Sequence, residues 1–255
     1  MRQYRNPSKG FTLIELSIVL VIIGLIISGV LVGNYLIKAA ELRAIYKQKE
    51  DIVAAINTFK LKYNYLPGDL PDATSYFGTN PAGCPAPTAS PQTNSTCNGN
   101  GNGIIDEVFT VWQQLAAANL IKGFYRGTQA SNGSPAYDST SMPAIAGSDN
   151  TWYLEHTNVD SWNGFELYQR FRNQHMMVST RSFGYGSPQL LTPAEMFSFD
   201  KKYDDGKPAS GNIQVLSDWQ LDGCTNPQSK PAPNAVYDTT KLDKNCDVVF
   251  LNLGF

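Results

Sequence analysis

The feature that most constrains this chain is an uncharged apolar run near its N-terminus, residues 16–37. The run holds 22 residues, which as a helix would measure about 33 Å, enough to cross a hydrocarbon core of about 30 Å. The ten residues MRQYRNPSKG at the N-terminus carry three positive charges and no negative charge. Because positively charged flanks stay cytoplasmic, we expect residues 1–10 inside and the rest of the chain exported.

One acidic residue, Glu15, lies at the edge of this run. A secretory signal peptide would have a shorter apolar region followed by small residues, whereas this run ends with Asn-Tyr-Leu-Ile. A plain N-terminal anchor fits the length, but neither interpretation explains Glu15. A carboxylate inside an apolar span costs a few kcal/mol unless it finds a partner, so Glu15 is a candidate functional residue.

The stretch KGFTLIELSIVLVIIGLI, residues 9–26, resembles the class III signal of type IV pilins and type II secretion pseudopilins. In that family a prepilin peptidase cuts after the glycine, and the new N-terminal residue is methylated. The resemblance implies a processing site at Lys9, Gly10 and Phe11, with cleavage between Gly10 and Phe11 and N-methyl-Phe11 as the first mature residue. It also implies that Glu15 pairs with the N-terminal amine of a neighbouring subunit during assembly.

The same resemblance implies a pilin-like α+β fold. A long N-terminal transmembrane and amphipathic helix would pack on a globular head with a small antiparallel β-sheet and two short helices. The implied partners are prepilin peptidase/methyltransferase, like or related pilin subunits in a filament, and inner-membrane assembly machinery. The precursor would be a single-pass inner-membrane protein with its head in the periplasm, and the mature chain would enter a pilus, which can reach the cell surface, or a pseudopilus. Many type IVa pilins have a proline near the position of Val32, which this sequence lacks.

Beyond the apolar run, residues 34–66 contain no Gly or Pro and favour helix. Apolar residues recur there at spacings of three, four or seven, which predicts one buried stripe: Leu42, Ile45, Ile52, Ile56, Phe59 and Tyr63. We expect one helix over residues 11–63 that ends before LPGDLP. The chain then divides into a cleaved leader at 1–10, a transmembrane and filament-core helix at 11–37, its amphipathic continuation at 38–66 and an exported head at 67–255.

Within the head, two segments favour helix. Residues 105–123 have an apolar face and end at a glycine, and residues 192–206 begin with Thr192, Pro193 and Glu195, the signature of a capping box with proline at the first helical position. The β-like segments are 151–156, 164–171, 175–181, 212–219 and 246–253. The Pro-, Asn- and Gly-rich segments 79–103, 127–150 and 225–240 are expected to be loops.

Four cysteines, Cys84, Cys97, Cys224 and Cys246, indicate disulfides in an oxidising compartment. Three pairings are possible. The short loops Cys84–Cys97 and Cys224–Cys246 are favoured because each pair brackets an irregular Pro- and Asn-rich stretch. A zinc site is not expected, because the sequence has no Cys-x-x-Cys and its two histidines are far from any cysteine.

Two segments resemble cation sites. In NGNGNGIIDE, residues 98–107, three alternating asparagines and Gly103 resemble the opening of a calcium loop, but Phe109 stands where a glutamate would close it, which favours a turn-rich hairpin. In DKKYDDGKPASG, Asp200, Asp204 and Asp205 form either a solvated turn neutralised by three nearby lysines or a calcium site. Major pseudopilins have a calcium site in the C-terminal part of the head, so the resemblance supports the second interpretation. No other cofactor is indicated.

Composition and motifs argue against two classes of function, nucleic-acid binding and catalysis. Without residues 1–10 the chain has 17 basic and 22 acidic residues, which argues against a nucleic-acid partner. We find no convincing nucleophile–base set, phosphate loop or metal-ligand spacing for catalysis, so we expect no enzymatic activity. The favoured function is a structural subunit (pilin, minor pilin or pseudopilin) of a type IV pilus or type II secretion pseudopilus. The alternative is a minor tip pilin or adhesin whose head binds a surface or partner through its long loops.

Overall fold

The computed structural model describes residues 10, 12–78, 97–105, 108–125, 139–157, 161–162, 165–167, 174–180, 189–217, 223–226 and 234–255. The chain forms two compact units, Met1–Ala44 and Ile45–Phe255. Of the three predicted loops, residues 79–96, 126–138 and 227–233 lie outside the described residues. Their proposed binding role therefore stays a prediction.

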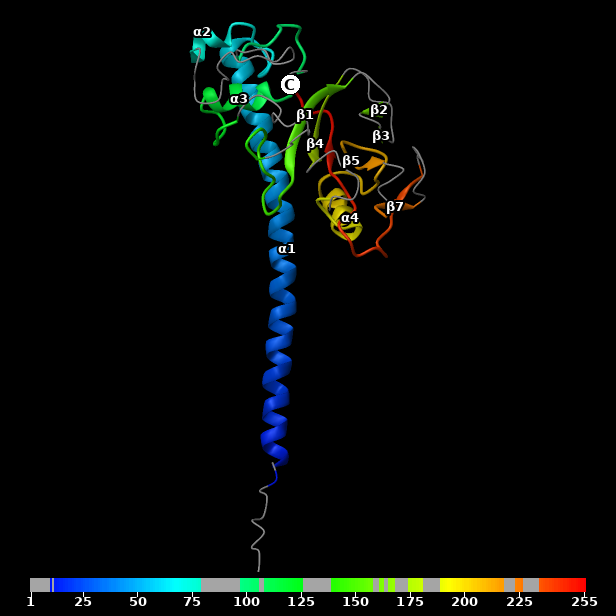
Figure 1. Ribbon diagram of the computed structural model, residues 1–255. Coiled ribbons are helices and arrows are strands. Elements are labelled where there is room, and N and C mark those ends of the chain that lie inside the picture. The colour runs from blue at the N-terminus through cyan, green and yellow to red at the C-terminus, as the bar shows by residue number, and fades with distance from the viewer. Residues whose placement is uncertain are drawn as a thin grey trace, which may run out of the picture. The chain divides into compact units, whose positions relative to one another are not determined.

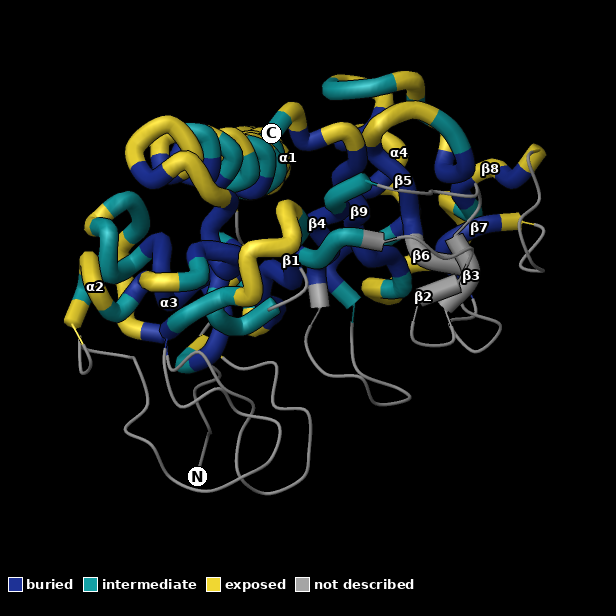
Figure 2. The backbone as a smooth tube through the Cα atoms, turned by 90° about the horizontal axis from the view of Figure 1, so that it is seen from above, coloured by how far each residue is buried: buried dark blue, intermediate teal, exposed yellow. Residues whose placement is uncertain are grey.

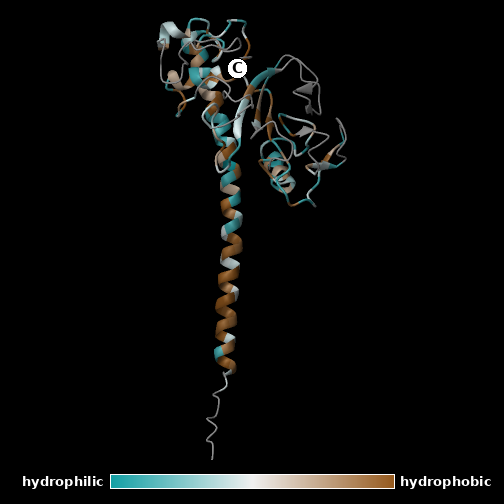
Figure 3. Cartoon of the chain, viewed as in Figure 1, coloured by the Kyte–Doolittle hydropathy of each residue, from teal (hydrophilic) through white to brown (hydrophobic). Residues whose placement is uncertain are grey.

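Helix α1 (Leu13–Tyr63) begins in the first unit and is the long helix that the sequence predicts. Its first half is dominated by hydrophobic residues, and its second half is mixed (Figure 3). The large apolar side chains of residues 13–37 are exposed. Among the described residues, α1 alone is long and apolar enough to cross a membrane. An exposed apolar surface of this length fits membrane anchoring.

The second unit contains the end of α1, and there the helix has one buried stripe. The buried residues are Ile45, Ile52, Ala55, Ile56, Phe59 and Tyr63. This confirms the predicted stripe from Ile45 onward, whereas Leu42 is only partly buried. The helix ends where Asn64 takes a positive φ of 59°, directly before the predicted proline-bounded turn at 66–71.

The main sheet is antiparallel and has the order β1-β4-β9-β5. Figure 1 labels β1, β4 and β5 of this sheet, and Figure 2 also labels β9. Its long strands, β1 (Thr151–Thr157) and β4 (Gln174–Thr180), pair along their whole length. β9 (Val249–Phe250) and β5 (Ile213–Gln214) add two residues each. Most residues of this sheet are buried (Figure 2). Two smaller sheets join β2 (Ser161–Trp162), β3 (Phe165–Leu167) and β6 (Leu216–Ser217), and β7 (Thr225–Asn226) and β8 (Val236–Tyr237).

Two predicted strands differ from the expectation within the described residues. In the segment 212–219, residues 213–214 form β5 and residues 216–217 form β6, with a break between them, and residues 218–219 lie outside the described residues. Residues 246–253 form only β9. Residues 246–253 pair with the main sheet only at β9, because Cys246 pairs with Leu191 in an isolated bridge and Asn252 has a positive φ of 48°. In the segment 164–171, β3 covers residues 165–167, and residues 164 and 168–171 lie outside the described residues.

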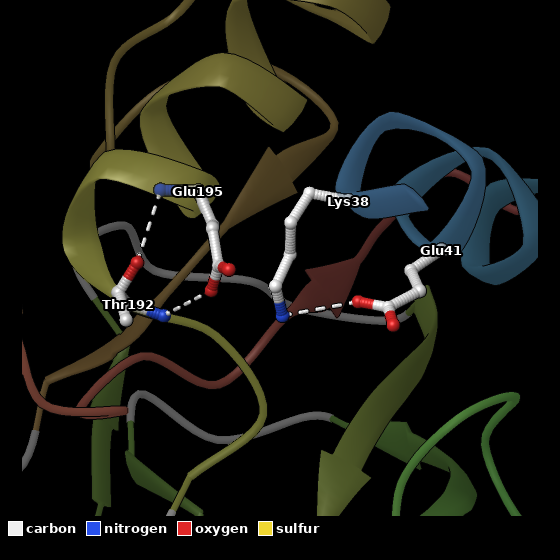
Figure 4. Close-up of polar contacts among 4 residues, drawn as sticks. All are labelled: Lys38, Glu41, Thr192 and Glu195. Atoms are coloured by element: carbon white, nitrogen blue, oxygen red, sulfur yellow. Dashed lines mark hydrogen bonds and ion pairs between the residues drawn. The ribbon is translucent and has the colours of Figure 1, made fainter. Parts of the chain in front are cut away.

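Three short helices complete the described part of the second unit. α4 (Pro193–Tyr203) has the predicted capping box: the Glu195 N–H donates to Thr192 Oγ1 at 3.3 Å, and the Thr192 N–H donates to Glu195 Oε2 at 3.0 Å (Figure 4). α3 (Thr110–Ala117) is shorter than predicted, because Ile105 instead contacts the sheet: its carbonyl accepts the His156 N–H, and its N–H donates to the His175 side chain. α2 (Ala73–Phe77) is not expected from the sequence. The long apolar helix, small antiparallel sheet and short helices confirm a pilin-like α+β fold.

Candidate processing and assembly site

The start of α1 holds Glu15 in a local hydrogen-bonded arrangement. Thr12 is the N-cap, and both its backbone N–H and its hydroxyl donate to Glu15 Oε2, at 2.8 and 2.7 Å. The Glu15 N–H donates back to Thr12 Oγ1 at 3.4 Å. This is a reciprocal capping box, and the helix dipole also favours a negative charge at this end. Glu15 therefore has a structural partner within its own chain, which our sequence reasoning missed although Thr-x-x-Glu is the signature of this motif.

The other residues of the predicted processing site are described only in part. Gly10 is exposed, and a Cβ atom added there would meet nothing within 4 Å. Lys9 and Phe11 lie outside the described residues. Close after them, the exposed apolar side chains of α1 begin at Leu13, and Glu15 is the one charged residue among residues 13–37. Directly after this surface, Lys38 and Glu41 form a surface ion pair at 3.1 Å (Figure 4).

The structure brings the three predicted calcium ligands together at the end of α4. One carboxylate oxygen from each of Asp200, Asp204 and Asp205 lies within 4.8 Å of the others. The Tyr237 hydroxyl donates to Asp200 at 2.6 Å, and the Ile213 N–H donates to Asp204 at 2.7 Å. These bonds fix the carboxylates in place, and an oxygen-only set of this kind suits Ca²⁺.

Electrostatics in this cluster favour a cation. Burial raises the pKa of Asp200 to about 7, hydrogen bonds from Tyr237 and Gly206 oppose that rise, and the charges of Asp205 and Asp204 add to it. Two of the three lysines that the sequence offered as counter-charges lie over aromatic rings: Lys201 over the Phe197 ring and Lys202 over the Tyr203 ring. Lys207 contacts the cluster through its backbone N–H, which donates to Asp205 Oδ1 at 2.9 Å. Among the described residues no ion pair joins them to the three aspartates. The cluster thus fits a cation.

The predicted Cys224–Cys246 disulfide is present. It joins the segment before β7 to the segment before β9, two short elements with little pairing of their own. Cys97 is also disulfide-bonded, while Cys84 lies outside the described residues. The pairing Cys84–Cys97 therefore stays a prediction.

Two polar residues of β4, four apart in sequence, have different partners. His175 Nε2 accepts the Ile105 N–H at 3.1 Å, and burial lowers the pKa of His175 to about 4. The Ser179 hydroxyl donates to Asp247 at 3.0 Å. Each side chain is engaged in packing the sheet against a neighbouring segment.

The comparisons with known proteins concern the N-terminus. Residues 5–31 match the family described as the prokaryotic N-terminal methylation motif. No curated protein and no solved structure matches the chain. The matched residues include Gly10, Glu15 and most of the apolar run. The chain therefore carries a type IV pilin-like prepilin signal, which implies processing by prepilin peptidase and assembly with other pilins.

Proposed function

We propose that this protein is a structural subunit (a pilin, minor pilin or pseudopilin) of a type IV pilus or a type II secretion pseudopilus. The observation that carries the proposal is the methylation motif at residues 5–31, whose larger part lies on a helix with an exposed apolar surface. Prepilin peptidase cleaves between Gly10 and Phe11, Phe11 is N-methylated, and the subunit assembles through α1. Its role is structural and not catalytic.

The exposed half of α1 gives this role a physical basis. Before assembly, the side chains of residues 13–37 lie in the inner membrane and the head lies in the periplasm. After assembly, these side chains pack against the same helix of neighbouring subunits. Before assembly, the capping box with Thr12 stabilises the carboxylate of Glu15 at the edge of the bilayer. During assembly the methylated amine of a neighbouring subunit pairs with Glu15, because both charges cost less when paired in a low dielectric. This pairing fixes the axial register of the two subunits.

A second proposal concerns the aspartate cluster. Asp200, Asp204 and Asp205 bind Ca²⁺ at the end of α4, a helix terminus that favours positive charge. The ion would offset the repulsion between the three carboxylates and stabilise the turn between α4 and β5. The cluster adds stability to the head and has no catalytic part.

The processing step is tested by mass spectrometry of the protein purified from cells with the cognate peptidase. The expected N-terminus is N-methyl-Phe11, and a chain that still begins at Met1 would refute the proposal. For assembly, Glu15→Ala should insert and be cleaved but fail to enter filaments, as measured in sheared or pelleted fractions. Glu41→Ala, which removes a surface carboxylate of the same helix, is the matched control and should assemble normally. Normal assembly of Glu15→Ala would exclude the pairing role.

A further inference from the structure

Two segments that are far apart in the sequence lie against each other in the second unit. They are the turn at 66–71 (LPGDLP) and the run of Asn-Gly pairs at 98–103 (NGNGNG). The two backbones approach closely, because a Cβ atom on Gly99 would lie 2.0 Å from the Gly68 carbonyl oxygen. The structure also corrects the expected turn-rich hairpin: the described residues 97–105 contain no strand.

All three glycines of this run donate their backbone N–H to the same two residues of the turn. The Gly99 N–H donates to the Leu70 carbonyl at 2.8 Å, and the Gly101 N–H donates to the Asp69 carbonyl at 3.0 Å. The Gly103 N–H donates to Oδ2 of the Asp69 side chain, also at 3.0 Å. The turn therefore engages the backbone nitrogen that follows each asparagine.

This nitrogen is the nucleophile in the spontaneous reaction of Asn-Gly pairs. The glycine nitrogen bonds to Cγ of the asparagine side chain and forms a succinimide ring. The bond from Cγ to the amide nitrogen breaks, and this amide leaves as ammonia with the proton that the glycine nitrogen gives up. Water then opens the ring at either carbonyl, which leaves aspartate or isoaspartate. Glycine favours ring closure because it has no Cβ atom to hinder it.

The hydrogen bonds to the turn oppose this reaction. In the succinimide, Cγ is bonded to the glycine nitrogen in the direction in which the N–H bond points in the peptide. In the folded head an acceptor oxygen occupies that direction, 2.8–3.0 Å from the nitrogen. The hydrogen bond has to break before the ring can close, so each pair reacts during a local opening of the contact.

The three pairs are protected to different degrees. Gly99 packs tightly on the turn, and Asn98 Oδ1 is also held by a backbone N–H of α2 at 2.9 Å. For Gly101 the acceptor is a backbone carbonyl, which moves only with the turn itself. For Gly103 the acceptor is a side chain, which can turn away while the backbone stays in place. Asn102 and Gly103 are both exposed, and a Cβ atom on Gly103 would meet nothing within 4 Å.

We propose that Asn102 is a deamidation site whose reaction Asp69 controls. While the Asp69 carboxylate accepts the Gly103 N–H, Asn102 is protected. When this contact opens, Asn102 is converted to aspartate or isoaspartate. The modification is confined to the head and is separate from the processing site at Gly10 and from the aspartate cluster at the end of α4.

The product changes the contact that controlled the reaction. Aspartate or isoaspartate at position 102 adds a negative charge one residue from the nitrogen that Asp69 holds, and like charges repel. Isoaspartate also lengthens the backbone before Gly103, which displaces its N–H. Both products make the contact between the two segments less favourable, so a head that has opened at the end of α1 closes less completely after the reaction.

The test follows conversion of each asparagine in the full chain in detergent at neutral pH. The incubation uses water enriched in heavy oxygen, which enters the product when the ring opens, and the protein is then digested in ordinary water for mass spectrometry. In wild type, Asn102 should react faster than Asn98 and Asn100. In urea all three should react faster than in the folded head and at similar rates, because the turn no longer holds the glycine nitrogens.

Two variants separate the role of the carboxylate from that of the fold. Asp69→Ala removes the acceptor of the Gly103 N–H and should speed the reaction of Asn102 about tenfold to a hundredfold. It keeps the backbone carbonyl that binds Gly101, so Asn98 and Asn100 in the same chain should keep their rates. Asp69→Asn, the matched control, retains an acceptor oxygen and should leave Asn102 close to the wild-type rate.

The wild-type rates require no substitution, which keeps the test decisive even if Asp69→Ala does not fold. The proposal is overturned if Asn102 in the folded wild type reacts no faster than Asn98 and Asn100, or as fast as it does in urea. An unchanged rate at Asn102 in a folded Asp69→Ala head would overturn the control by Asp69. Equal acceleration of all three asparagines in that head would overturn it too.

Discussion

Replacing Asp247 by asparagine should remove much of the pH dependence of this protein's stability between about pH 4 and pH 7. Asp247 precedes β9 and is 6% exposed. The Ser179 hydroxyl donates to its Oδ1 at 3.0 Å. With its amide nitrogen turned toward the carboxyl group, Gln189 donates to both carboxyl oxygens. An amide turned the other way accepts a hydrogen bond, so Gln189 can also partner a protonated carboxyl group or an asparagine.

The sign and size of the effect follow from the pKa of Asp247. Burial raises this pKa from 3.8 to about 7, and the hydrogen bond from Ser179 only partly opposes the rise. The folded chain therefore keeps a proton that the unfolded chain has released, and its free energy of unfolding decreases as pH rises from about 4 to about 7. A difference of about three pH units corresponds to about 4 kcal/mol. The loss is complete above pH 7.

The measurement is urea unfolding of the full chain in detergent at several pH values from 4 to 8, followed by tryptophan fluorescence. The other titrating groups are the same in wild type and Asp247→Asn, so the difference between the two curves isolates Asp247. We expect the difference in free energy of unfolding to grow with pH up to about 7, in favour of the asparagine variant. The control is Asp51→Asn, an exposed carboxylate on α1 that is paired with Lys47. Curves for wild type and Asp247→Asn that run parallel across this range would refute the reasoning.

Three further predictions follow from single contacts. Replacing both Cys224 and Cys246 by serine should lower the free energy of unfolding by about 3 kcal/mol, because the bond closes a loop with a sequence separation of 22; an unchanged urea midpoint would contradict this. Gln48→Ala should lower the free energy of unfolding by about 1 to 2 kcal/mol, because the amide donates to the Ala144 carbonyl at 2.7 Å and accepts the Ala146 N–H at 3.0 Å. Lys47→Ala, at the neighbouring surface position, is the control and should lower it by less than about 1 kcal/mol. Adding EDTA should lower the melting temperature of wild type more than that of Asp205→Asn, and equal shifts would count against a cation at the end of α4.

Local sequence signals predicted the features that depend on neighbouring residues. The long helix and its buried stripe from Ile45 to Tyr63 follow from apolar spacing, and the start of α4 follows from Thr192, Pro193 and Glu195. The prepilin signal is also local, since leader charge, glycine, glutamate and apolar run lie within one short stretch. The capping box of Thr12 and Glu15 could have been predicted in the same way.

Features that depend on contacts between distant segments were not predictable. α2 has no side-chain cap of its own, and the acceptor for its Thr74 N–H comes from Asn98. α3 starts late because Ile105 bonds to β1 and β4. The strand near the C-terminus is short because Cys246 is held by Leu191 and by the disulfide to Cys224. In each case a long-range hydrogen bond or covalent bond outweighs local propensity.

The sequence by itself determined where the prepilin signal lies and which helix presents an exposed apolar surface, because charge, glycine and hydrophobic length act over consecutive residues. Only the tertiary structure decided which polar groups share a site. It placed Asp69 beside Gly103 and gathered the aspartates at the end of α4. Groups from different segments can act on one another only after the backbone has brought them together, and that step depends on the packing of the whole head.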